Sequence, residues 1–492
     1  MNAPNSGKEY AETPISSRKS TLIALLVAVA FFMENLDGTV IATALPQMGQ
    51  SFHVSPVDLN IGMTAYMLTL AVFIPISGWF ADRLGARTVF VSAIAIFTAS
   101  SILCGLSHGI WEFTMARVVQ GIGGSMMVPV GRLVVLRSTE KRDLMRAIAY
   151  ITWPGLAAPV IGPPVGGFIT TYASWHWIFF LNVPLGIVGV ILASLWIQNH
   201  PSEHLRPFDW AGFALTSTAC TTFMYGMELI GRQDTPWRTA SLCLGAGALL
   251  GVLAVLHIRR TPHPILDFLM LKIHTYAISI WGGSAFRIAI SVSPFLLPLM
   301  FQVGFGLNAF QSGLLLFALF AGNLSMKSVT TPILRRFGFR NTLLVNGLAT
   351  AAAILACAFL APSTPRILVL TVLFVNGLCR SMQFTSLNTL AFVDVPKPQL
   401  SSATSLFSMV QQMSMGMGVA VGAIALRVAG LFTRPVGAPT VAQFHIAFVF
   451  VAILAATAVL DCLPLHPHAG AEVSRHRPQD YERAEAAEVS QE

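Results

Sequence analysis

Residues 21–45 read TLIALLVAVAFFMENLDGTVIATAL, a run whose only charged side chains are those of Glu34 and Asp37. A helix of about 20 apolar residues is long enough to cross the hydrocarbon core of a bilayer. This stretch is therefore predicted to span a membrane. Because a carboxylate is costly to hold in lipid, two acids in one span also indicate a functional site.

The rest of the chain has the same character. It has 492 residues, of which 54% are hydrophobic and 11% charged, and its mean hydropathy is +0.67. Its apolar blocks lack the alternation of barrel strands, so we expect an all-α integral membrane protein with 14 transmembrane helices. The predicted spans are 21–45, 60–80, 88–107, 110–136, 144–170, 175–197, 209–230, 238–258, 276–303, 310–333, 340–361, 366–393, 400–427 and 442–463.

The basic residues predict the orientation of these spans. If the N-terminus is cytoplasmic, twenty of the 30 Lys and Arg residues fall in inner segments and five in outer loops. Cationic loops resist translocation, so this asymmetry favours both termini in the cytoplasm. No cleavable signal is apparent, and we expect a multi-pass protein of the inner (cytoplasmic) membrane.

Several function classes lack support in the sequence. The net charge of +8 is spread over short loops, without a nucleic-acid motif, so no nucleic-acid partner is expected. The 6 cysteines lie in or beside apolar blocks without CxxC spacing, which gives no indication of a metal site. Neither a P-loop nor an HExxH motif is present, so ATP-driven transport and zinc hydrolysis are not expected.

An internal repeat divides the chain. Residues 78–87 (GWFADRLGAR) resemble residues 331–340 (TPILRRFGFR), with Gly85 matching Gly338 253 positions later. A second match, offset by 256, pairs QGIGGSM at 120–126 with NGLCRSM at 376–382. Repeated halves are common in secondary transporters. We expect a tail at 1–20, a six-helix bundle at 21–197, two inserted helices at 198–273, a second bundle at 274–463 and a tail at 464–492.

Four stretches together resemble a known family. They are LDGTVIATALP at 36–46, the loop at 78–87, RVVQGIGG at 117–124 and APVIGPPVGG at 158–167. They are similar to motifs of the fourteen-span drug:proton antiporters of the major facilitator superfamily, of the EmrB/QacA type and closest to its MdtD-like exporters. The resemblance implies the major facilitator fold, two six-helix bundles with two extra central helices.

The resemblance also implies roles for particular residues. The first stretch implies proton coupling by Asp37, and the third implies that Arg117 tunes it. Glu34 is a further proton-coupling candidate because it lies three residues before Asp37 on the same helix face. Counting residues from the inner ends of their spans, Asp37 and Arg117 differ in depth by only about 5 Å, so Arg117 is placed to act on the acids. A conformational latch is implied at Gly78, Asp82, Arg83, Gly85 and Arg87, and an antiport motif at Gly162, Pro163, Gly166 and Gly167.

A substrate cavity is expected between the halves, lined in the second half by Arg287, Arg380, Gln383, Asn388 and Gln411. For the amides, hydrogen bonding between helices is the favoured role, and contact with a ligand is the alternative. With Glu34 and Asp37 set against Arg117, Arg287 and Arg380, the cavity is balanced or slightly basic. This favours anionic, zwitterionic or neutral amphipathic substrates over simple lipophilic cations.

The sequence therefore predicts a proton-coupled exporter of small amphipathic compounds, a secondary active transporter and not an enzyme. The proton gradient is its energy source, and no cofactor is expected. An exporter dedicated to one metabolite, such as an amino acid, a siderophore or a lipid-like compound, stays open as an alternative, with a membrane-embedded enzyme or a channel more distant. Whether a periplasmic adaptor takes part stays open too.

Overall fold

The computed structural model describes residues 17–139, 144–199, 207–231, 237–261, 266, 268–396, 400–433, 439–467 and 469–470. Within these ranges all regular structure is helical, with no strand. The predicted tails lie mostly outside the described residues. The helices are α1 (Ser17–Phe52), α2 (Asn60–Phe73), α3 (Ser77–Leu84), α4 (Ala86–Gly105), α5 (Ile110–Ser138), α6 (Leu144–Tyr172), α7 (Trp177–Phe180), α8 (Asn182–Trp196), α9 (Trp210–Gly231), α10 (Trp237–Ile258), α11 (His274–Leu299), α12 (Ala309–Cys357), α13 (Arg366–Val393), α14 (Leu400–Thr433) and α15 (Val441–Ala458).

Some of these helices join or divide the predicted spans. A short 3₁₀ turn, Ile74–Ile76, links α2 to α3, and it contains Pro75, which has no N–H to donate. Helix α12 includes both predicted spans 310–333 and 340–361 and turns at Gly338, where φ is 70°. The two spans are therefore the two arms of one bent element.

The described part of the chain has 11 helices long and apolar enough to cross a membrane, judged by length and composition. This search counts α12 once and does not include α6 or α9. Large apolar side chains on the outside of the bundles are highly exposed, among them Leu195 at 71%, Ile367 at 72% and Phe359 at 76%. Such a surface is stable when lipid covers it.

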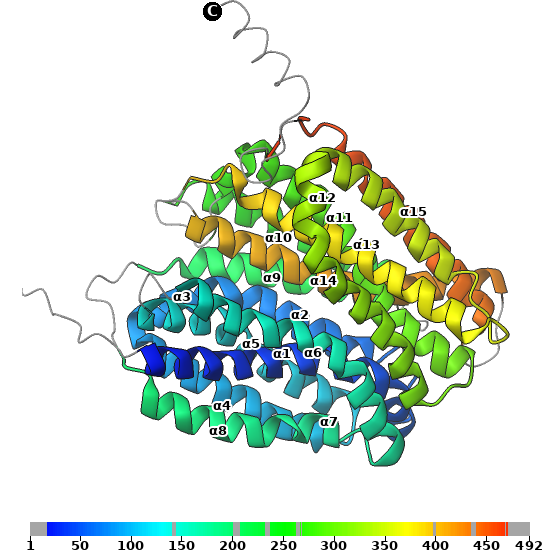
Figure 1. The fold of residues 1–492 in the computed structure, drawn as a ribbon, viewed down its shortest axis with the longest axis horizontal. Helices are drawn as coiled ribbons and strands as arrows, with labels where there is room; N and C mark the ends of the chain where they lie inside the picture. Colours follow the sequence, from blue (N-terminus) through cyan, green and yellow to red (C-terminus); the bar gives the residue numbers. More distant parts are fainter. Residues whose placement is uncertain are drawn as a thin grey trace, which may run out of the picture.

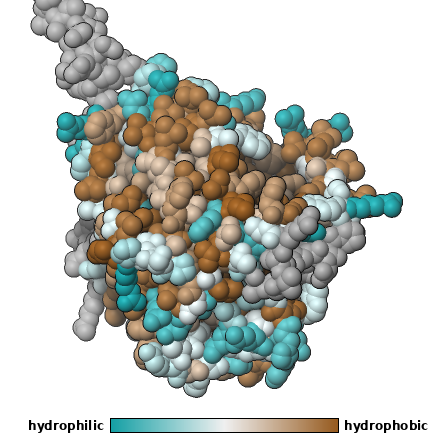
Figure 2. All heavy atoms as spheres, turned by 90° about the vertical axis from the view of Figure 1, so that its right-hand side faces the viewer, coloured by the Kyte–Doolittle hydropathy of each residue, from teal (hydrophilic) through white to brown (hydrophobic). Residues whose placement is uncertain are grey.

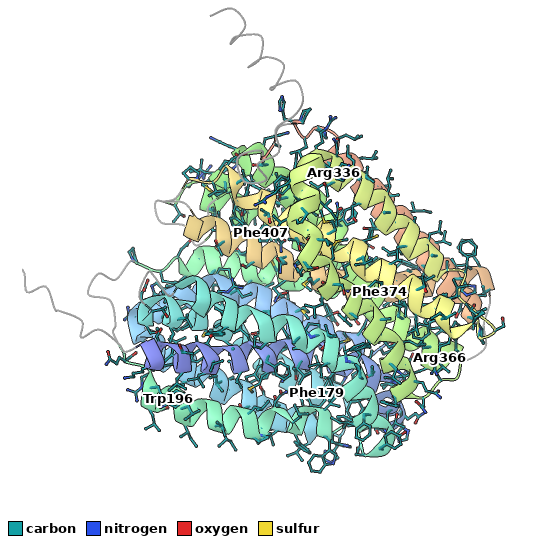
Figure 3. All side chains as sticks on the ribbon, viewed as in Figure 1. Phe179, Trp196, Arg336, Arg366, Phe374 and Phe407 are labelled. Carbon is teal, nitrogen blue, oxygen red and sulfur yellow. The ribbon has the colours of Figure 1, made fainter. Side chains whose placement is uncertain are left out.

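The helices form two bundles side by side (Figure 1), with α1–α8 in one and α11–α15 in the other. The bundles meet through α6 with α12 and through α2 with α14. Arg336 and Arg366, which were predicted to lie on opposite sides of the membrane, lie at different ends of the second bundle (Figure 3). Figure 2 faces the end where α12 begins, and hydrophilic residues are scattered there among hydrophobic ones.

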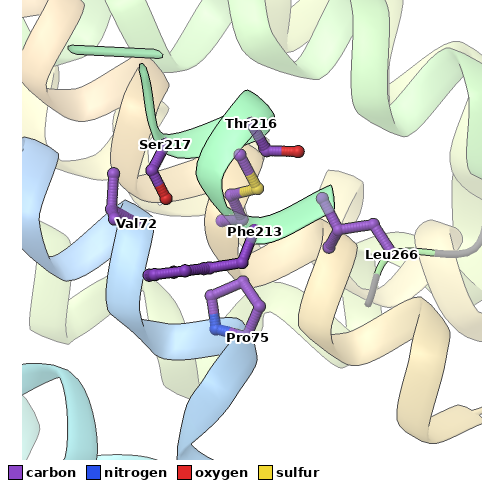
Figure 4. Close-up of a pocket in the computed structure, with 7 residues that line it drawn as sticks. Val72, Pro75, Phe213, Thr216, Ser217 and Leu266 are labelled. Carbon is purple, nitrogen blue, oxygen red and sulfur yellow. The ribbon is translucent and has the colours of Figure 1, made fainter. Parts of the chain in front are cut away.

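Of the two inserted helices, α9 packs against both bundles. Helix α9 contacts α10, α2 and α14. A small pocket lies at this junction, lined by Pro75 of the first bundle, Phe213 of α9 and Met409 of α14 (Figure 4). Its lining contains no titratable side chain. The pocket therefore lies where α9 packs against the two bundles, and its lining has no group able to carry a proton.

Equivalent residues of the two bundles confirm the internal repeat. Gly85 and Gly338 both have positive φ, 87° and 70°, which a side chain would make costly. The thiol of Cys104 lies 3.7 Å from the Gln120 amide oxygen, and the thiol of Cys357 lies 3.8 Å from the Asn376 amide nitrogen. Cys357 follows Cys104 by 253 positions and Asn376 follows Gln120 by 256, the same offsets as in the two sequence matches.

The apolar core shows where the bundles join. One cluster includes Leu45 and Met48 near the end of α1 together with Phe301 and Leu316 of the second bundle. Gln302 adds a hydrogen bond across the same contact, from its Nε2 to the Thr43 carbonyl at 3.2 Å. We call this the outer end, following the predicted orientation. Two other clusters lie one within each bundle, and a further cluster contains Ala71 of α2 together with Leu406 and Phe407 of α14, so the bundles also meet away from the outer end.

Candidate functional site

Asp37 of α1 and Arg117 of α5 form a buried ion pair. Arg117 Nη1 lies 2.5 Å from Asp37 Oδ2, and both side chains are 1% exposed. Asp37 Oδ1 accepts two further hydrogen bonds, from Gln120 Nε2 at 3.0 Å and from Asn182 Nδ2 at 3.2 Å. Three helices, α1, α5 and α8, therefore enclose one carboxylate. A buried charge held by a counter-charge and by hydrogen bonds is compatible with the interior.

A second layer orients the Asp37–Arg117 pair. Gln120 donates to Ser101 Oγ at 2.8 Å and also accepts a hydrogen bond from Arg117. The Arg117 guanidinium carbon lies 4.1 Å above the ring of Tyr66. This stacking stabilises a desolvated guanidinium. The hydroxyl of Tyr66 and the Nε of Arg117 are enclosed without a hydrogen-bond partner, so the polar network has unused donors.

Glu34 lies one helical turn from Asp37 in a different environment. The residue as a whole is half-buried, but its Oε2 is enclosed and accepts no hydrogen bond. Arg132 of α5 is a cation whose charge acts on Glu34, and it makes a cation–π contact with Phe31, 5.9 Å from the ring centroid. A buried oxygen without a donor is most easily accommodated when the carboxyl group is protonated. Asp37 and Glu34 thus differ in how well the protein solvates their charged forms.

The glycine-rich stretch of α6 lies between α1 and α12. A Cβ on Gly162 would collide with Thr39, and one on Gly166 would lie 2.7 Å from Thr43 Oγ1. On the other side, a Cβ on Gly167 would collide with the backbone of Ala309, and the carbonyl of Pro163 faces Gly313 of α12. The Phe310 N–H donates to Thr171 Oγ1 at 3.0 Å in the same contact. Helix α6 therefore connects the two bundles through backbone approaches that only small residues permit.

The predicted latch loop is organised by a residue outside it. Gly85 has φ of 87° and approaches the side chain of Asn199, which follows α8. Asn199 Nδ2 donates to the Leu84 carbonyl at 3.2 Å and to Thr88 Oγ1 at 3.0 Å. In the same loop, Gly78, Asp82 and Arg83 are exposed and Arg87 is half-buried, with Arg83 5.3 Å from the Trp79 ring. A contact of this loop with the second bundle stays a prediction.

The candidates of the second bundle divide into two groups. Arg287 is 1% exposed and donates to the Ser279 carbonyl at 3.1 Å and to Asn388 Oδ1 at 3.3 Å. Gln383 accepts from Asn346 Nδ2 and donates to the Leu343 carbonyl, so both ends of its amide bind α12. Arg380 and Gln411 are half-buried. Arg287, Gln383 and Asn388 therefore serve contacts inside the second bundle. Arg380 and Gln411 stay candidates for binding substrate.

A model of the Major Facilitator Superfamily matches residues 27–419, which is more than half of the chain. The chain belongs to the Major Facilitator Superfamily. It is a multi-pass membrane protein of the all-helical superfamily fold, and the superfamily's two-bundle build agrees with the repeat described above.

Within the superfamily, the chain is similar to bacterial MdtD proteins, whose name proposes a role in multidrug resistance. It is 35% identical to MdtD of Citrobacter koseri over 476 residues, 95% of this chain and 99% of that protein. It is 37% identical to MdtD of Klebsiella pneumoniae (strain 342) over 409 residues, 82% of this chain and 86% of that protein.

Solved structures of the superfamily share the fold at low identity. A D-xylose-proton symporter matches with a TM-score of 0.65 and 14% identity, covering 91% of this chain and 97% of its own. The nucleoside transporter NupG matches with a TM-score of 0.61 and 15% identity, covering 90% of this chain and 98% of its own.

Sequence analysis missed several residues of the site in this superfamily member, among them Asn182, Arg132 and Asn199. Asn182 lies 145 positions after Asp37 and was not among the predicted site residues, although it donates to Asp37. Arg132 was not recognised, although it lies in the span that carries Arg117 and is the cation beside Glu34. Asn199 lies 114 positions after Gly85 and gave no local signal. Only Arg132 had a signal in the sequence, as one more ionisable residue inside a predicted span.

Proposed function

We propose that this protein is a proton-driven exporter of small amphipathic compounds, working by alternating access between its two bundles. The observation that carries the proposal is the pair of acids on α1, with Asp37 fully paired and Glu34 left with an unpartnered buried oxygen. The similarity to MdtD proteins supports multidrug efflux as the transport class. The proton gradient supplies the energy, and the protein is neither an enzyme nor dependent on a cofactor.

The two acids have different tasks in this proposal. Asp37 accepts hydrogen bonds from Arg117, Gln120 and Asn182, so protonating it would leave a buried guanidinium without a counter-charge. Glu34 has no such set of donors and can take up a proton at lower cost. Glu34 is therefore the group that loads and releases the transported proton. The Asp37–Arg117 pair senses this change from one helical turn away.

The contacts between the bundles indicate which side of the transporter is closed in this conformation. The outer ends are joined by α6 and α12 and by the apolar cluster that includes Leu45 and Phe301. This arrangement corresponds to a state closed on the outer side. Substrate would enter from the cytoplasmic side. For a proton to reach Glu34 from the outer side, the contact between Gly167 of α6 and Ala309 of α12 would have to open.

The membrane topology belongs to the same proposal. If α6, α9 and each arm of α12 cross the bilayer as well, the chain has 14 spans. Both termini then lie in the cytoplasm, and the protein resides in the inner membrane. The bundles would comprise residues 21–197 and 274–463, separated by the inserted segment 198–273. The 20 basic residues of the inner segments support this orientation.

Reconstituted protein tests the proposal directly. Purified protein in liposomes with an imposed pH gradient is expected to expel amphipathic dyes and to collapse the gradient in return, until a protonophore is added. Glu34→Gln is expected to abolish substrate-stimulated proton flux while dye binding persists. Asp37→Asn is expected to impair both, because it disturbs the packing of α1, α5 and α8.

A matched carboxylate serves as the control. Glu112 is exposed at the outer end, where it pairs with His108 across 3.8 Å. Glu112→Gln is expected to transport like the wild type. Unchanged proton flux in the Glu34→Gln, Asp37→Asn double variant would show that these acids do not couple protons to export.

A further inference from the structure

Three arginines lie at mid-depth, and two of them are already engaged. Arg117 is paired with Asp37, and Arg287 donates to Ser279 and Asn388 and lies 4.6 Å from the Phe407 ring. Each is 1% exposed. Neither is accessible to a ligand in this conformation. The remaining guanidinium, that of Arg380, is different.

Arg380 has no polar partner in the part of the chain that the structure describes. Its Nη1 is enclosed without a hydrogen-bond partner, no acidic side chain among the described residues forms an ion pair with it, and its guanidinium carbon lies 5.9 Å from the centroid of the Phe320 ring. The residue is only half-buried. An unpaired guanidinium at this depth is costly unless a counter-charge reaches it.

The position of Arg380 on α13 directs it away from lipid. The exposed apolar stripe of α13 includes Ile367 and Phe374, at 72% and 37% exposure. At 3.6 residues per turn, Arg380 points about 120–140° away from both. It follows Gly377 by one turn, where α13 touches the backbone of α12 at Leu319.

The neighbourhood of Arg380 reaches the seam between the bundles. Leu319 and Phe320 belong to the apolar cluster that also contains Leu36 and Val40 of α1. An apolar molecule bound between the bundles here would be surrounded by aliphatic and aromatic side chains and could reach the unpaired guanidinium of Arg380. This combination suits a ligand with an apolar body and one anionic group.

We propose that Arg380 is the anion-binding residue of the substrate site and that amphipathic organic anions and zwitterions are the preferred substrates. The planar guanidinium pairs bidentately with a carboxylate, sulfonate or phosphate, and the apolar cluster around Phe320 holds the body. That such a ligand is cargo rests on the proposed export function. That it binds at Arg380 does not.

Acid–ester pairs test this binding without any transport. The probes are rhodamine 110 and its methyl ester rhodamine 123, cholate and methyl cholate, and naproxen and its methyl ester. Binding is measured on purified protein in nanodiscs without a pH gradient, by fluorescence anisotropy for the dyes and by thermal shift for the rest. The wild type is expected to bind the acids at least about tenfold more tightly than the esters, about 1.4 kcal/mol.

Variants assign the preference to Arg380. Arg380→Gln is expected to lose the discrimination between acid and ester, and Arg380→Lys, which keeps the charge but not the planar fork, to retain part of it. Lys327→Gln is the matched control, because Lys327 is also cationic and within a span but already donates to Thr385 Oγ1 at 2.6 Å. Discrimination in this control is expected to be unchanged.

Two results would overturn the inference. One is a wild type without preference for any acid over its ester, and the other is an Arg380→Gln variant that is folded and discriminates as before. Proton flux in liposomes decides the proposed function separately. Discrimination lost in Arg380→Gln together with absent proton flux would leave the anion site standing and refute proton-coupled export.

Discussion

Arg117 Nη1 and Asp37 Oδ2 lie 2.5 Å apart, although the two residues are 80 positions apart in the chain and belong to different helices, α5 and α1. The pair is closed off from solvent and shares Gln120 as a common partner. Its existence means that neither residue can be changed alone without leaving the other charge buried. The pair therefore couples α1 to α5 within the first bundle.

Breaking the pair is expected to destabilise the protein. Arg117→Met and Asp37→Asn should each lower the free energy of unfolding by about 3–5 kcal/mol, because the remaining charge loses its counter-charge. The double variant should lose less than the sum of the two. Denaturant unfolding of purified protein in detergent measures the three values, and strictly additive losses would show that the two residues are not coupled.

Removing the unpaired charge is expected to have the opposite effect. Arg380→Met should raise the melting temperature of the ligand-free protein, because an uncompensated guanidinium is replaced by an apolar side chain of similar length. The same variant should lose export activity. Differential scanning fluorimetry with a transport assay checks both, and a melting temperature well below that of the wild type would indicate a structural partner for Arg380.

The contact of α6 with α12 is expected to control opening at the outer end. Gly167→Ala places a methyl group against the backbone of Ala309 and should cost about 1–3 kcal/mol in the closed state. A cysteine introduced at the fully buried Ser312 should then react faster with an impermeant maleimide added from outside. Gly38→Ala is the control, since nothing lies within 4 Å of its Cβ, and equal labelling rates in both variants would contradict this role.

The two positive-φ glycines are expected to be equivalent in both halves. Gly85→Ala and Gly338→Ala should each cost about 1–3 kcal/mol, because φ of 87° with ψ of 141° and φ of 70° with ψ of 173° are backbone angles that essentially only glycine adopts. A Cβ on Gly85 would in addition collide with the Asn199 side chain. Gly78→Ala, in helix α3 with free space around it, should be neutral or slightly stabilising. Unfolding midpoints measure the three variants, and a loss in Gly78→Ala as large as in Gly85→Ala would contradict the conformational explanation.

The loop before α7 is expected to respond to acid. Burial, with His108 nearby, lowers the pKa of His176 below its ordinary value of 6.5. The folded state therefore binds the proton less readily than the unfolded chain, so this contribution to stability is present above about pH 6.5 and is lost as the pH falls below it. His176→Gln should flatten the difference in melting temperature between pH 7.5 and pH 5.5. An identical pH dependence in the variant would exclude His176 as its source.

Much of the architecture was predictable because lipid imposes strong rules on sequence. Long apolar blocks must be helices, and a repeated pattern of Arg and Gly at residues 78–87 and 331–340 predicts repeated bundles. The depth of Asp37 and Arg117 could be counted because a helix rises regularly. The near-match in depth, together with the family resemblance that makes the two spans neighbours, placed Arg117 to act on Asp37, and the structure shows the two side chains in contact.

The sequence by itself thus determined the all-helical membrane class, the duplicated bundles and the acids of α1, since hydrophobic length, charge distribution and periodicity are local properties. Only the tertiary structure decided which charges are satisfied. Asn182, Gln120 and Arg117 converge on Asp37 from two other helices, whereas Glu34, one turn away, and Arg380 receive no such partners. Hydrogen bonding and desolvation depend on groups distant in the chain, so residues equally rare in a membrane span differ in what they can do.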